Sequence, residues 1–324
     1  MQEFLIQNVQ NNKVYEVSDI TSNIKLEQKL NNGCSKLTFD LINDGKVSIS
    51  NGSPIRFKYN NTGMFFGYMF KKQRKDKYIS SITAYDQLRY LKAKDTMSLT
   101  NLNMAGIIRK IANIYGLKVG KLEVSNILPD RLEDNKTMLD IIYTAISENL
   151  KLSGDKYCFY DKFGELTLED IYNMRTNILI GDKSNCTGYD FTQSIDDDTY
   201  NQIKLVSENK DTKKRDVYIT KDSSKIATWG LLQYYEKCNN MNHSQLIDKA
   251  NTLLKTKNRE QLKLKLDSLG IETVKPGTGV FVKLEEINDV KINNFFVVNQ
   301  VTHTFNKTYT MSLDLDMPSA EVLK

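Results

Sequence analysis

The chain has 324 residues, a formal net charge of +5, 40% hydrophobic residues and 26% charged residues. This composition is typical of a folding chain, because disordered chains contain fewer apolar and aromatic residues. The small net charge argues against a dedicated nucleic-acid binder, which usually carries a larger and more clustered basic surplus. At about 150 residues per domain, the length predicts two or three domains.

The sequence predicts neither a secretory leader nor a membrane helix. Met1–Asn8 lacks a basic start and a sustained apolar run, and no stretch approaches the roughly 18 apolar residues that a membrane helix needs. The four cysteines, Cys34, Cys158, Cys186 and Cys238, lie far apart without a CxxC pair. We therefore expect them to be reduced and mostly buried, not joined in disulfides or gathered around a metal ion.

Residues 1–95 are predicted to form a small antiparallel β-barrel or sandwich. Leu37, Phe39 and Leu41 alternate with polar residues, which is typical of a strand with one buried face. Polar turns such as Asn31-Asn32-Gly33 recur at the spacing expected of short strands, about 8–12 residues. The predicted strands cover residues 4–9, 14–17, 23–28, 36–41, 55–59, 64–70 and 78–85.

Residues 96–172 change to a helical period. Apolar residues recur at steps of three and four over 104–115 and again over 138–146, which predicts two amphipathic helices. Thr137 is the expected N-cap of the second helix, and Gly116 is expected to end the first. The alternation over 157–168, around Asp161-Lys162-Phe163-Gly164, predicts a β-hairpin.

Residues 173–324 return to strand patterns, with one predicted helix inserted at about 242–258. Strands are expected near 201–207, 216–220, 261–266, 279–284, 295–301 and 309–315. The predicted fold class is therefore α+β. It comprises two small antiparallel β-barrel domains, residues 1–95 and 173–324, with a helical and hairpin region at 96–172 between them.

The two β regions share a weak internal similarity. Segments 55–85 and 280–315 each contain an alternating strand, then a strand that opens with a Phe-Phe pair, then a strand that begins at Tyr. The pairs are Phe65-Phe66 and Phe295-Phe296. This pattern is compatible with a duplicated barrel and also with a coincidence of β-patterning.

The sequence predicts no catalytic, cofactor-binding or metal-binding residue. His243 lies near a helix start and His303 lies among alternating strand positions, so neither is expected to act as a base. Asp196-Asp197-Asp198 is the densest acidic run, but no EF-hand spacing follows it, and a solvated loop is the simpler interpretation. Gly277-Thr278-Gly279 precedes a strand and not a helix, so we interpret it as a turn.

The strongest basic cluster is Lys71–Lys77, which lies between two predicted strands. The simpler interpretation is a strand edge and turn kept soluble by lysine. The alternatives are contact with an acidic partner surface or with DNA that passes nearby.

Several segments resemble the hub proteins of phage tails. They are Tyr78–Leu91, the following helix that ends at Tyr115-Gly116-Leu117, the hairpin at 157–168, and the closing segments Pro276–Leu284, Val297–His303 and Met311–Leu315. The resemblance is to the family that includes the tail proteins of defective Bacillus prophages and the late control protein D group. It spans nearly the whole chain.

The resemblance implies a structural baseplate hub of a contractile phage tail or a phage-tail-like bacteriocin. Such a hub is a homotrimer of chains with two tube-like barrels each, which joins a hexameric tail tube to a trimeric spike. The implied partners are the tube protein, the spike or cell-puncturing protein, and possible tape measure and baseplate wedge proteins. Neither a membrane nor a specific nucleic acid is an expected partner. The implied location is the virion baseplate or the bacteriocin particle, after assembly in the bacterial cytoplasm.

Three other interpretations stay open at this point. The many carboxylates are compatible with a cell-wall hydrolase, the Lys71–Lys77 turn with DNA contact, and the family resemblance with another component of the tail tip. A cleavage assay would test the first, and salt-sensitive duplex binding would test the second.

Overall fold

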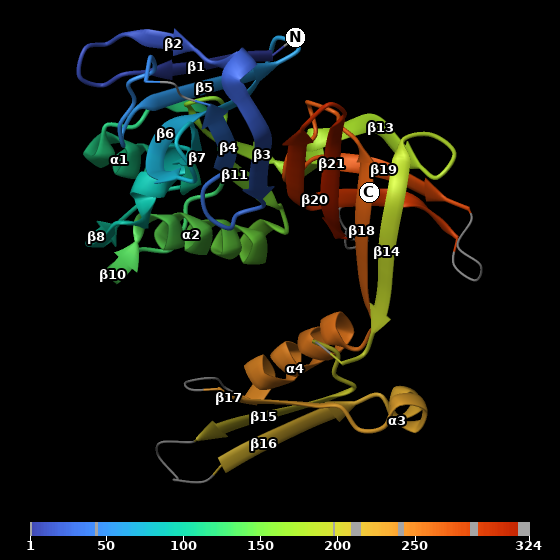
Figure 1. The fold of residues 1–324 in the computed structure, drawn as a ribbon. Coiled ribbons are helices and arrows are strands. Elements are labelled where there is room, and N and C mark those ends of the chain that lie inside the picture. Colours follow the sequence, from blue (N-terminus) through green and yellow to red (C-terminus); the bar gives the residue numbers. More distant parts are fainter. Residues whose placement is uncertain are drawn as a thin grey trace. The chain divides into compact units, whose positions relative to one another are not determined.

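The computed structural model describes residues 2–42, 45–196, 198–208, 215–238, 243–285 and 291–316. The chain divides into two compact units, Met1–Tyr189 with Lys265–Lys324, and Asp190–Leu264 (Figure 1). Among the described residues, no helix is long and apolar enough to cross a membrane.

The N-terminal segment forms seven strands, as predicted. They are paired antiparallel in the order β3-β4-β7-β6-β5-β1-β2. The strands are β1 (Gln2–Gln7), β2 (Val14–Glu16), β3 (Thr21–Lys29), β4 (Lys36–Ile42), β5 (Pro54–Tyr59), β6 (Thr62–Arg74) and β7 (Ile79–Tyr85), with a short 3-10 helix, η1 (Ser18–Ile20), between β2 and β3.

This part of the sheet is strongly curved around an aromatic core. Phe4 of β1 and Phe39 of β4 are separated by three strands along the sheet, yet their ring centroids lie 4.6 Å apart. Phe57 lies 5.2 Å from Phe4, and Phe305 lies 4.8 Å from Phe57. All four side chains are buried. The inward face therefore gains its stability from apolar burial, about 1.5–3 kcal/mol for each such side chain.

The region after β7 forms a helical layer on a small sheet. Its elements are η2 (Gln87–Lys92), β8 (Lys94–Leu99), α1 (Met104–Tyr115), β9 (Val119–Leu122), β10 (Arg131–Thr137), α2 (Met138–Ser153), β11 (Tyr157–Asp161), β12 (Leu166–Asp170) and η3 (Ile171–Met174). β11 and β12 are the predicted hairpin, and β9 adds to β12 in parallel.

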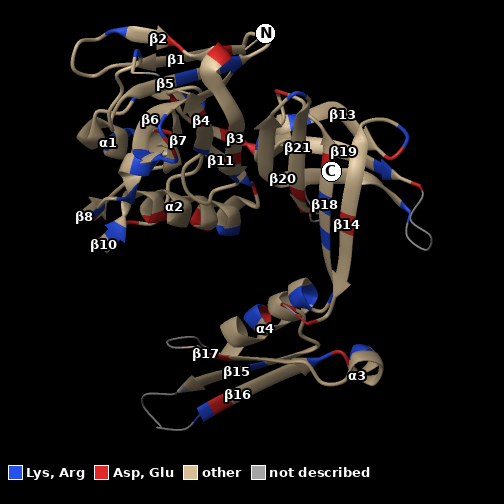
Figure 2. Ribbon diagram, in the orientation of Figure 1, with Lys and Arg blue, Asp and Glu red and all other residues tan. Residues whose placement is uncertain are grey.

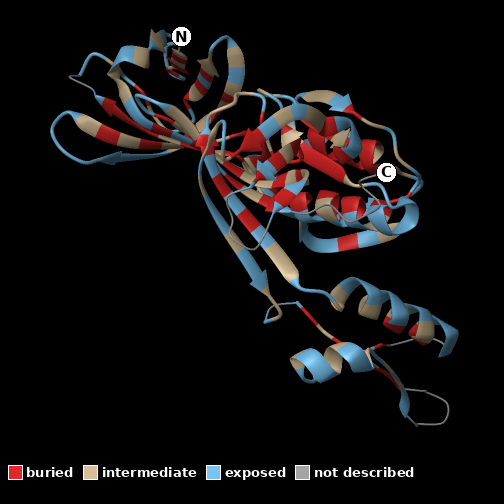
Figure 3. Ribbon diagram, turned by 90° about the vertical axis from the view of Figure 1, so that its right-hand side faces the viewer, coloured by how far each residue is buried: buried red, intermediate tan, exposed pale blue. Residues whose placement is uncertain are grey.

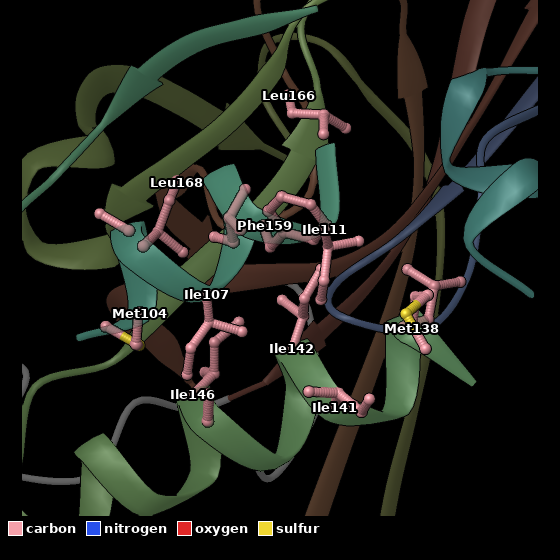
Figure 4. Close-up of a cluster of buried hydrophobic side chains, with 14 of the residues drawn as sticks. Met104, Ile107, Ile111, Met138, Ile141, Ile142, Ile146, Phe159, Leu166 and Leu168 are labelled. Atoms are coloured by element: carbon pink, nitrogen blue, oxygen red, sulfur yellow. The ribbon is translucent and has the colours of Figure 1, made fainter. Parts of the chain in front are cut away.

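Both predicted helices of this region are confirmed, together with their predicted ends. The hydroxyl of Thr137 accepts a hydrogen bond from Asp140 N at 3.0 Å, and Gly116 ends α1 with a left-handed φ of 61°. The apolar faces of α1 and α2 meet the hairpin in one cluster, in which Ile111, Ile142 and Phe159 are fully or almost fully buried (Figure 4). Truncating such a residue to alanine typically costs about 2–5 kcal/mol.

The second β region of this unit contributes six strands. They are β13 (Arg175–Gly181), β14 (Cys186–Ser194), β18 (Gln261–Leu269), β19 (Gly279–Leu284), β20 (Ile292–Phe305) and β21 (Tyr309–Asp316). Five of them follow the order β14-β18-β21-β20-β19, and β13 pairs with β19 in parallel. Buried and exposed positions alternate along β18 and β21, as the sequence predicts for strands with one buried face (Figure 3).

The strand order of the first half is repeated in the second half. In the first half, the strands that come third to seventh in the chain lie in the order β3-β4-β7-β6-β5. The second half has the order β14-β18-β21-β20-β19. If the five strands of each half are numbered one to five along the chain, both halves have the spatial order one-two-five-four-three. The long strands β6 and β20 also match, because each pairs with one neighbour along its first part and with another along its second part, and each carries an irregularity in register.

The two halves are joined through β3 and β20. Gln300–Phe305 of β20 pairs antiparallel with Ile24–Lys29 of β3, so all thirteen strands belong to one sheet. The described pairings leave this sheet open at β2, β13 and β14. The mostly β, α+β class is confirmed, whereas the arrangement as two closed barrels stays a prediction.

The second unit is a three-stranded sheet with one helix packed on it. Its strands lie in the order β16-β15-β17, and β17 runs parallel to β15. The helix matches the one predicted near residues 242–258, but the sequence predicted neither α3 nor β17. The elements are β15 (Gln202–Glu208), β16 (Arg215–Lys221), α3 (Ser223–Trp229), β17 (Gln233–Lys237) and α4 (His243–Lys257).

Candidate functional site

His303 is a buried structural residue, as predicted for a strand position. Its Nε2 lies 3.0 Å from the carbonyl oxygen of Val274, and its Nδ1 lies 2.9 Å from the hydroxyl of Tyr309. Both ring nitrogens therefore have a partner, and the ring is inaccessible to solvent. Burial lowers the pKa of His303 to about 4, so the ring is neutral near pH 7.

The other residues singled out by the sequence form no joint site. His243 is the first residue of α4 and lies 6.2 Å from the ring of Tyr218. In the acidic run, Asp198 pairs with Lys257 at 2.6 Å, and Asp197 lies outside the described residues. Within the described ranges, no group of three or more His, Cys, Asp and Glu side chains could hold a metal ion.

The glycine pair and the cysteines have structural roles. Gly277 adopts a φ of 87° in a turn that Thr278 closes by donating its N–H to the carbonyl of Lys275 at 3.0 Å. β19 follows directly, so the predicted turn before a strand is confirmed.

All four cysteines are free thiols; Cys158 and Cys238 are buried, and Cys34 and Cys186 are half-buried. Burial raises the pKa of the Cys158 thiol to about 12, which makes it a poor nucleophile.

The basic cluster Lys71–Lys77 lies at the end of β6 and in the turn before β7 (Figure 2). Lys71, Lys72 and Arg74 are exposed, and Lys75 pairs with Asp40 at 3.0 Å. Beyond Tyr68, no strand of the described residues pairs with the edge of β6 that faces away from β7. The cluster therefore occupies an open strand edge, as the sequence predicted.

Two polar clusters that the sequence did not reveal lie within the first unit. Asp86 accepts backbone hydrogen bonds from Ser35 at 2.8 Å and Leu88 at 3.0 Å, and burial raises its pKa. Asp161 also has a raised pKa, first because it is buried and second because of the charge of Asp86. Spatial pairs of this kind have no signal in the order of residues along the chain.

The second cluster joins the hairpin to the turn before β19. The hydroxyl of Tyr160 donates to Glu169 at 2.5 Å, and Lys275 Nζ lies 3.3 Å from the same carboxylate. Lys275 also contacts the hydroxyl of Tyr160 and lies 4.0 Å from the centre of its ring. Burial lowers the pKa of Lys275, and Glu169 opposes that effect. All of its members have partners, so this cluster is a structural link between the two segments.

The sequence also missed a surface on the outward face of β6. Phe66, Tyr68 and Phe70 alternate with the buried Phe65 and Met69, so both faces of this strand carry large apolar groups. Such a run is also typical of a strand buried on both sides, which is why the pattern alone did not indicate a surface.

Comparison with known proteins identifies the family. A model of the YQBQ-like family matches residues 24–316. The chain belongs to the YQBQ-like family. Two relatives from Bacillus subtilis (strain 168) are each 27% identical to it. They are the uncharacterized protein YqbQ, over 274 residues, and the phage-like element PBSX protein XkdQ, over 280 residues. Each comparison covers 83% of this chain and 82% of the relative.

Solved structures share the fold of this YQBQ-like chain. The 43 kDa tail protein of prophage MuSo2 from Shewanella oneidensis has a TM-score of 0.73 at 11% identity, and covers 99% of this chain and 100% of its own. A tail protein from Neisseria meningitidis MC58 has a TM-score of 0.68 at 13% identity, with 98% and 96% covered. The predicted resemblance to a phage tail family is confirmed, and identities this low show a common fold alone.

Proposed function

We propose that this YQBQ-like chain is a structural baseplate hub of a contractile phage tail or phage-tail-like bacteriocin. In this role it is a trimeric adaptor between a hexameric tail tube and a trimeric spike. The observation that carries the proposal is the repeated strand order, β3-β4-β7-β6-β5 and β14-β18-β21-β20-β19. The proposal includes no catalytic role.

The repeat supports the adaptor role because a threefold object can match a sixfold one only when each chain presents a similar surface twice. Three chains with two such halves each supply six similar halves to a ring. The pairing of β3 with β20 is the junction between the two halves of one chain. A ring then needs a comparable junction between the second half of one chain and the first half of the next.

Two open strand edges are suited to that second junction. By the repeat, β6 corresponds to β20 and β14 corresponds to β3. Beyond Tyr68, the edge of β6 that faces away from β7 has no strand neighbour among the described residues. β14 is the last strand in the order of the sheet. The β6 end carries Lys71, Lys72 and Arg74, whereas β14 contains Asp190 and no basic residue. We infer that β14 of one copy pairs antiparallel with the end of β6 of the next copy.

Mass measurement tests the assembly. The full-length chain is mixed with its tube and spike proteins, and native mass spectrometry is expected to report three copies of this chain per assembly. A monomeric free chain is compatible with the proposal, because the proposed junction forms when the partner proteins bring the two strand edges together. A chain that stays monomeric with both partners present and binds neither contradicts the proposal.

Cysteine cross-linking tests the proposed edges separately. In a Cys186→Ser background, Lys72→Cys on β6 is combined with Tyr189→Cys on β14, an exposed position. Oxidation of the assembled sample is expected to give covalent dimers and trimers, because paired strands bring Cβ atoms within disulfide range. Lys72→Cys with Tyr172→Cys is the control, since Tyr172 is also exposed but lies in η3. Equal cross-linking of both pairs contradicts the strand assignment.

The adaptor role assigns a part to each segment. Residues 1–95 and 173–324 are the proposed tube-like domains, and residues 96–172 brace them from outside the ring. The proposed partners are the tube protein, the spike protein, the tape measure protein and the baseplate wedge proteins. The proposed location is the baseplate of the virion or bacteriocin particle. The tail proteins that share this fold support the assignment.

A further inference from the structure

A continuous row of six aromatic rings lies on the first unit, outside the aromatic core. Neighbouring centroids are 5.6–6.2 Å apart. Phe66, Tyr68 and Phe70 are on the outward face of β6. The Tyr90 side chain is 39% exposed, and the other five rings are half-buried. In order, the row is Phe163, Phe66, Tyr68, Tyr90, Phe70 and Tyr85, and we call it the aromatic row.

An arginine lies over a ring near each end of the aromatic row. The guanidinium carbon of Arg56 is 5.5 Å from the centre of the Phe163 ring, and that of Arg89 is 5.3 Å from the centre of the Phe70 ring. Arg56 approaches Glu3 at 3.7 Å, and no carboxylate of the described residues forms an ion pair with Arg89. Arginine and tyrosine, together with tryptophan, are enriched among the residues that anchor protein interfaces.

A cavity of about 410 Å³ opens at the Phe163 end of the row. Phe66, Tyr68 and Phe163 supply its aromatic wall. Its charged lining residues are Arg56, Lys118 and Glu165, so positive charge exceeds negative charge there. A second cavity of about 200 Å³ shares Arg56 and Phe66 with the first and extends toward β2. The two cavities share Arg56 and Phe66 in their lining, and we call them together the groove.

The backbone is strained where Phe163 enters this groove. Phe163 adopts a φ of 53°, a left-handed conformation that is rare for a bulky residue. Gly164, with a φ of 96°, follows it, and its N–H donates to Asp161 Oδ1 at 2.7 Å. Strained residues of this kind persist where the surrounding structure holds them, and they concentrate at binding surfaces.

The ring geometry indicates which class of ligand fits. Neighbouring rings along the row meet at 51–78°, so they form no coplanar platform on which bases or sugars would stack in succession. A corrugated aromatic surface with a pocket instead suits the side chains of a protein segment. The excess of positive charge favours a segment that carries carboxylates.

We propose that the aromatic row and its groove dock an extended segment of another protein. This segment places a bulky apolar side chain between Phe66, Tyr68 and Phe163 and directs carboxylates toward Arg56 and Arg89. The proposal goes beyond the adaptor role and does not depend on a threefold assembly, because every residue involved lies in the first unit of a single chain.

Fluorescence anisotropy with short labelled peptides tests the proposal on the full-length chain. The first probe has a tryptophan and a leucine flanked by glutamates, and the second has lysines in place of the glutamates. The glutamate probe is expected to bind at least about tenfold more tightly than the lysine probe, and its binding should weaken as salt rises. Equal binding of the two probes overturns the proposal.

Variants identify the surface. Phe66→Ala is expected to weaken binding of the glutamate probe by at least about tenfold, the usual effect of losing an interface anchor. Arg89→Glu reverses a charge outside the core and leaves the packed rings intact. It is expected to weaken binding of the glutamate probe. Arg56→Glu should also shift preference toward the lysine probe. Thermal unfolding of each variant shows whether it is folded.

Tyr172→Ala is the matched control. Tyr172 is 52% exposed, and Arg175 lies 4.5 Å from the centre of its ring, so the pair has the same chemistry away from the aromatic row. Binding is expected to be unchanged. If Tyr172→Ala weakens binding as much as Phe66→Ala, or if Arg89→Glu has no effect, the assignment is wrong. Tighter binding of a single-stranded oligothymidylate than of the glutamate probe would overturn it in favour of a nucleic-acid surface.

Discussion

The hydroxyl of Tyr309 on β21 donates a hydrogen bond across 2.9 Å to Nδ1 of His303 on β20, the strand that joins the two halves of the sheet. Because Nδ1 accepts this hydrogen bond, Nε2 carries the ring hydrogen and donates a hydrogen bond to the carbonyl oxygen of Val274 at 3.0 Å. This arrangement requires a neutral ring, since a protonated imidazole has no acceptor to offer Tyr309. Burial accordingly lowers the pKa of His303 to about 4.

The first prediction is that His303 makes the chain sensitive to acid. The unfolded imidazole takes up a proton near pH 6.5, and the folded one does so only near pH 4. Its contribution to the free energy of unfolding is therefore present above pH 6.5 and is lost as pH falls toward 4. The expected loss is on the order of 3 kcal/mol. Urea unfolding of the native chain and of His303→Gln over this range measures it.

The control for this experiment is His243→Gln, because His243 is exposed at the start of α4. Its unfolding free energy should follow the native curve at every pH. His303→Gln should show a flatter dependence between pH 6.5 and 4, even if it is less stable overall. Parallel curves for the native chain and His303→Gln would refute the assignment.

Much of the fold could be predicted from the sequence because its signals are local. The alternation of Leu37, Phe39 and Leu41 is enough to predict β4, and the spacing of apolar residues is enough to predict α1. The pairing of β3 with β20 has no such signal, because its partners lie at opposite ends of the chain. Local patterns also gave no indication of β17, whose polar and tyrosine residues carry little apolar alternation.

The interaction surfaces were less predictable than the elements that carry them. The sequence identified Lys71–Lys77 because a basic run is contiguous. The aromatic row draws its rings from β6, β7, η2 and the β11–β12 turn, so only the fold brings them together. Asp86 and Asp161 illustrate the same limit, since their coupling depends on burial and proximity.

The second prediction concerns this buried pair. Burial and the charge of Asp86 hold the pKa of Asp161 above its ordinary value, so the contribution of Asp161 to the free energy of unfolding falls as pH rises above about 4. Asp161→Asn keeps an oxygen to accept from Gly164 N and removes the charge. It should be more stable than the native chain at pH 8, by on the order of 2 kcal/mol, with a smaller difference at pH 4. Urea unfolding at both pH values measures this.

Asp155→Asn provides the comparison, because Asp155 is an exposed carboxylate just before the same hairpin. Its substitution should change the free energy of unfolding by no more than about 0.5 kcal/mol at either pH. An Asp161→Asn chain that is less stable than the native chain at pH 8 would show that the Asp161 charge is compensated.

The third prediction concerns Gly67, at the centre of β6. A Cβ atom at this position would lie 2.3 Å from the carbonyl oxygen of Tyr85 and 2.5 Å from the ring of Phe65. The backbone oxygen cannot move without disturbing β7, so Gly67→Ala should destabilise the chain by about 2–3 kcal/mol. Gly188→Ala in β14 is the control, because the nearest heavy atom to its Cβ would be 3.7 Å away. Thermal unfolding that ranks the two variants equally would contradict the prediction.

The fourth prediction concerns Asn31, whose side chain acts as a short strand partner for β11. Its Nδ2 donates to the carbonyl of Tyr157 at 2.7 Å, and its Oδ1 accepts from the N–H of Phe159 at 2.8 Å. Asn31→Ala leaves both backbone groups without this partner and places alanine at a φ of 44°. The expected loss of stability is about 3 kcal/mol.

Two further substitutions separate the hydrogen bonds from the backbone conformation. Glycine adopts the left-handed φ of residue 31 without steric cost, but Asn31→Gly still lacks the side-chain amide. This variant should therefore show most of the loss of stability expected for Asn31→Ala. Asn12→Gly, at an exposed left-handed residue with a φ of 57°, should be nearly neutral. Hydrogen exchange provides the local readout, because the Phe159 amide should exchange faster in both Asn31 variants and not in Asn12→Gly. Unchanged exchange at Phe159 would show that Asn31 forms only the β3–β4 turn and does not hold the hairpin against the N-terminal sheet.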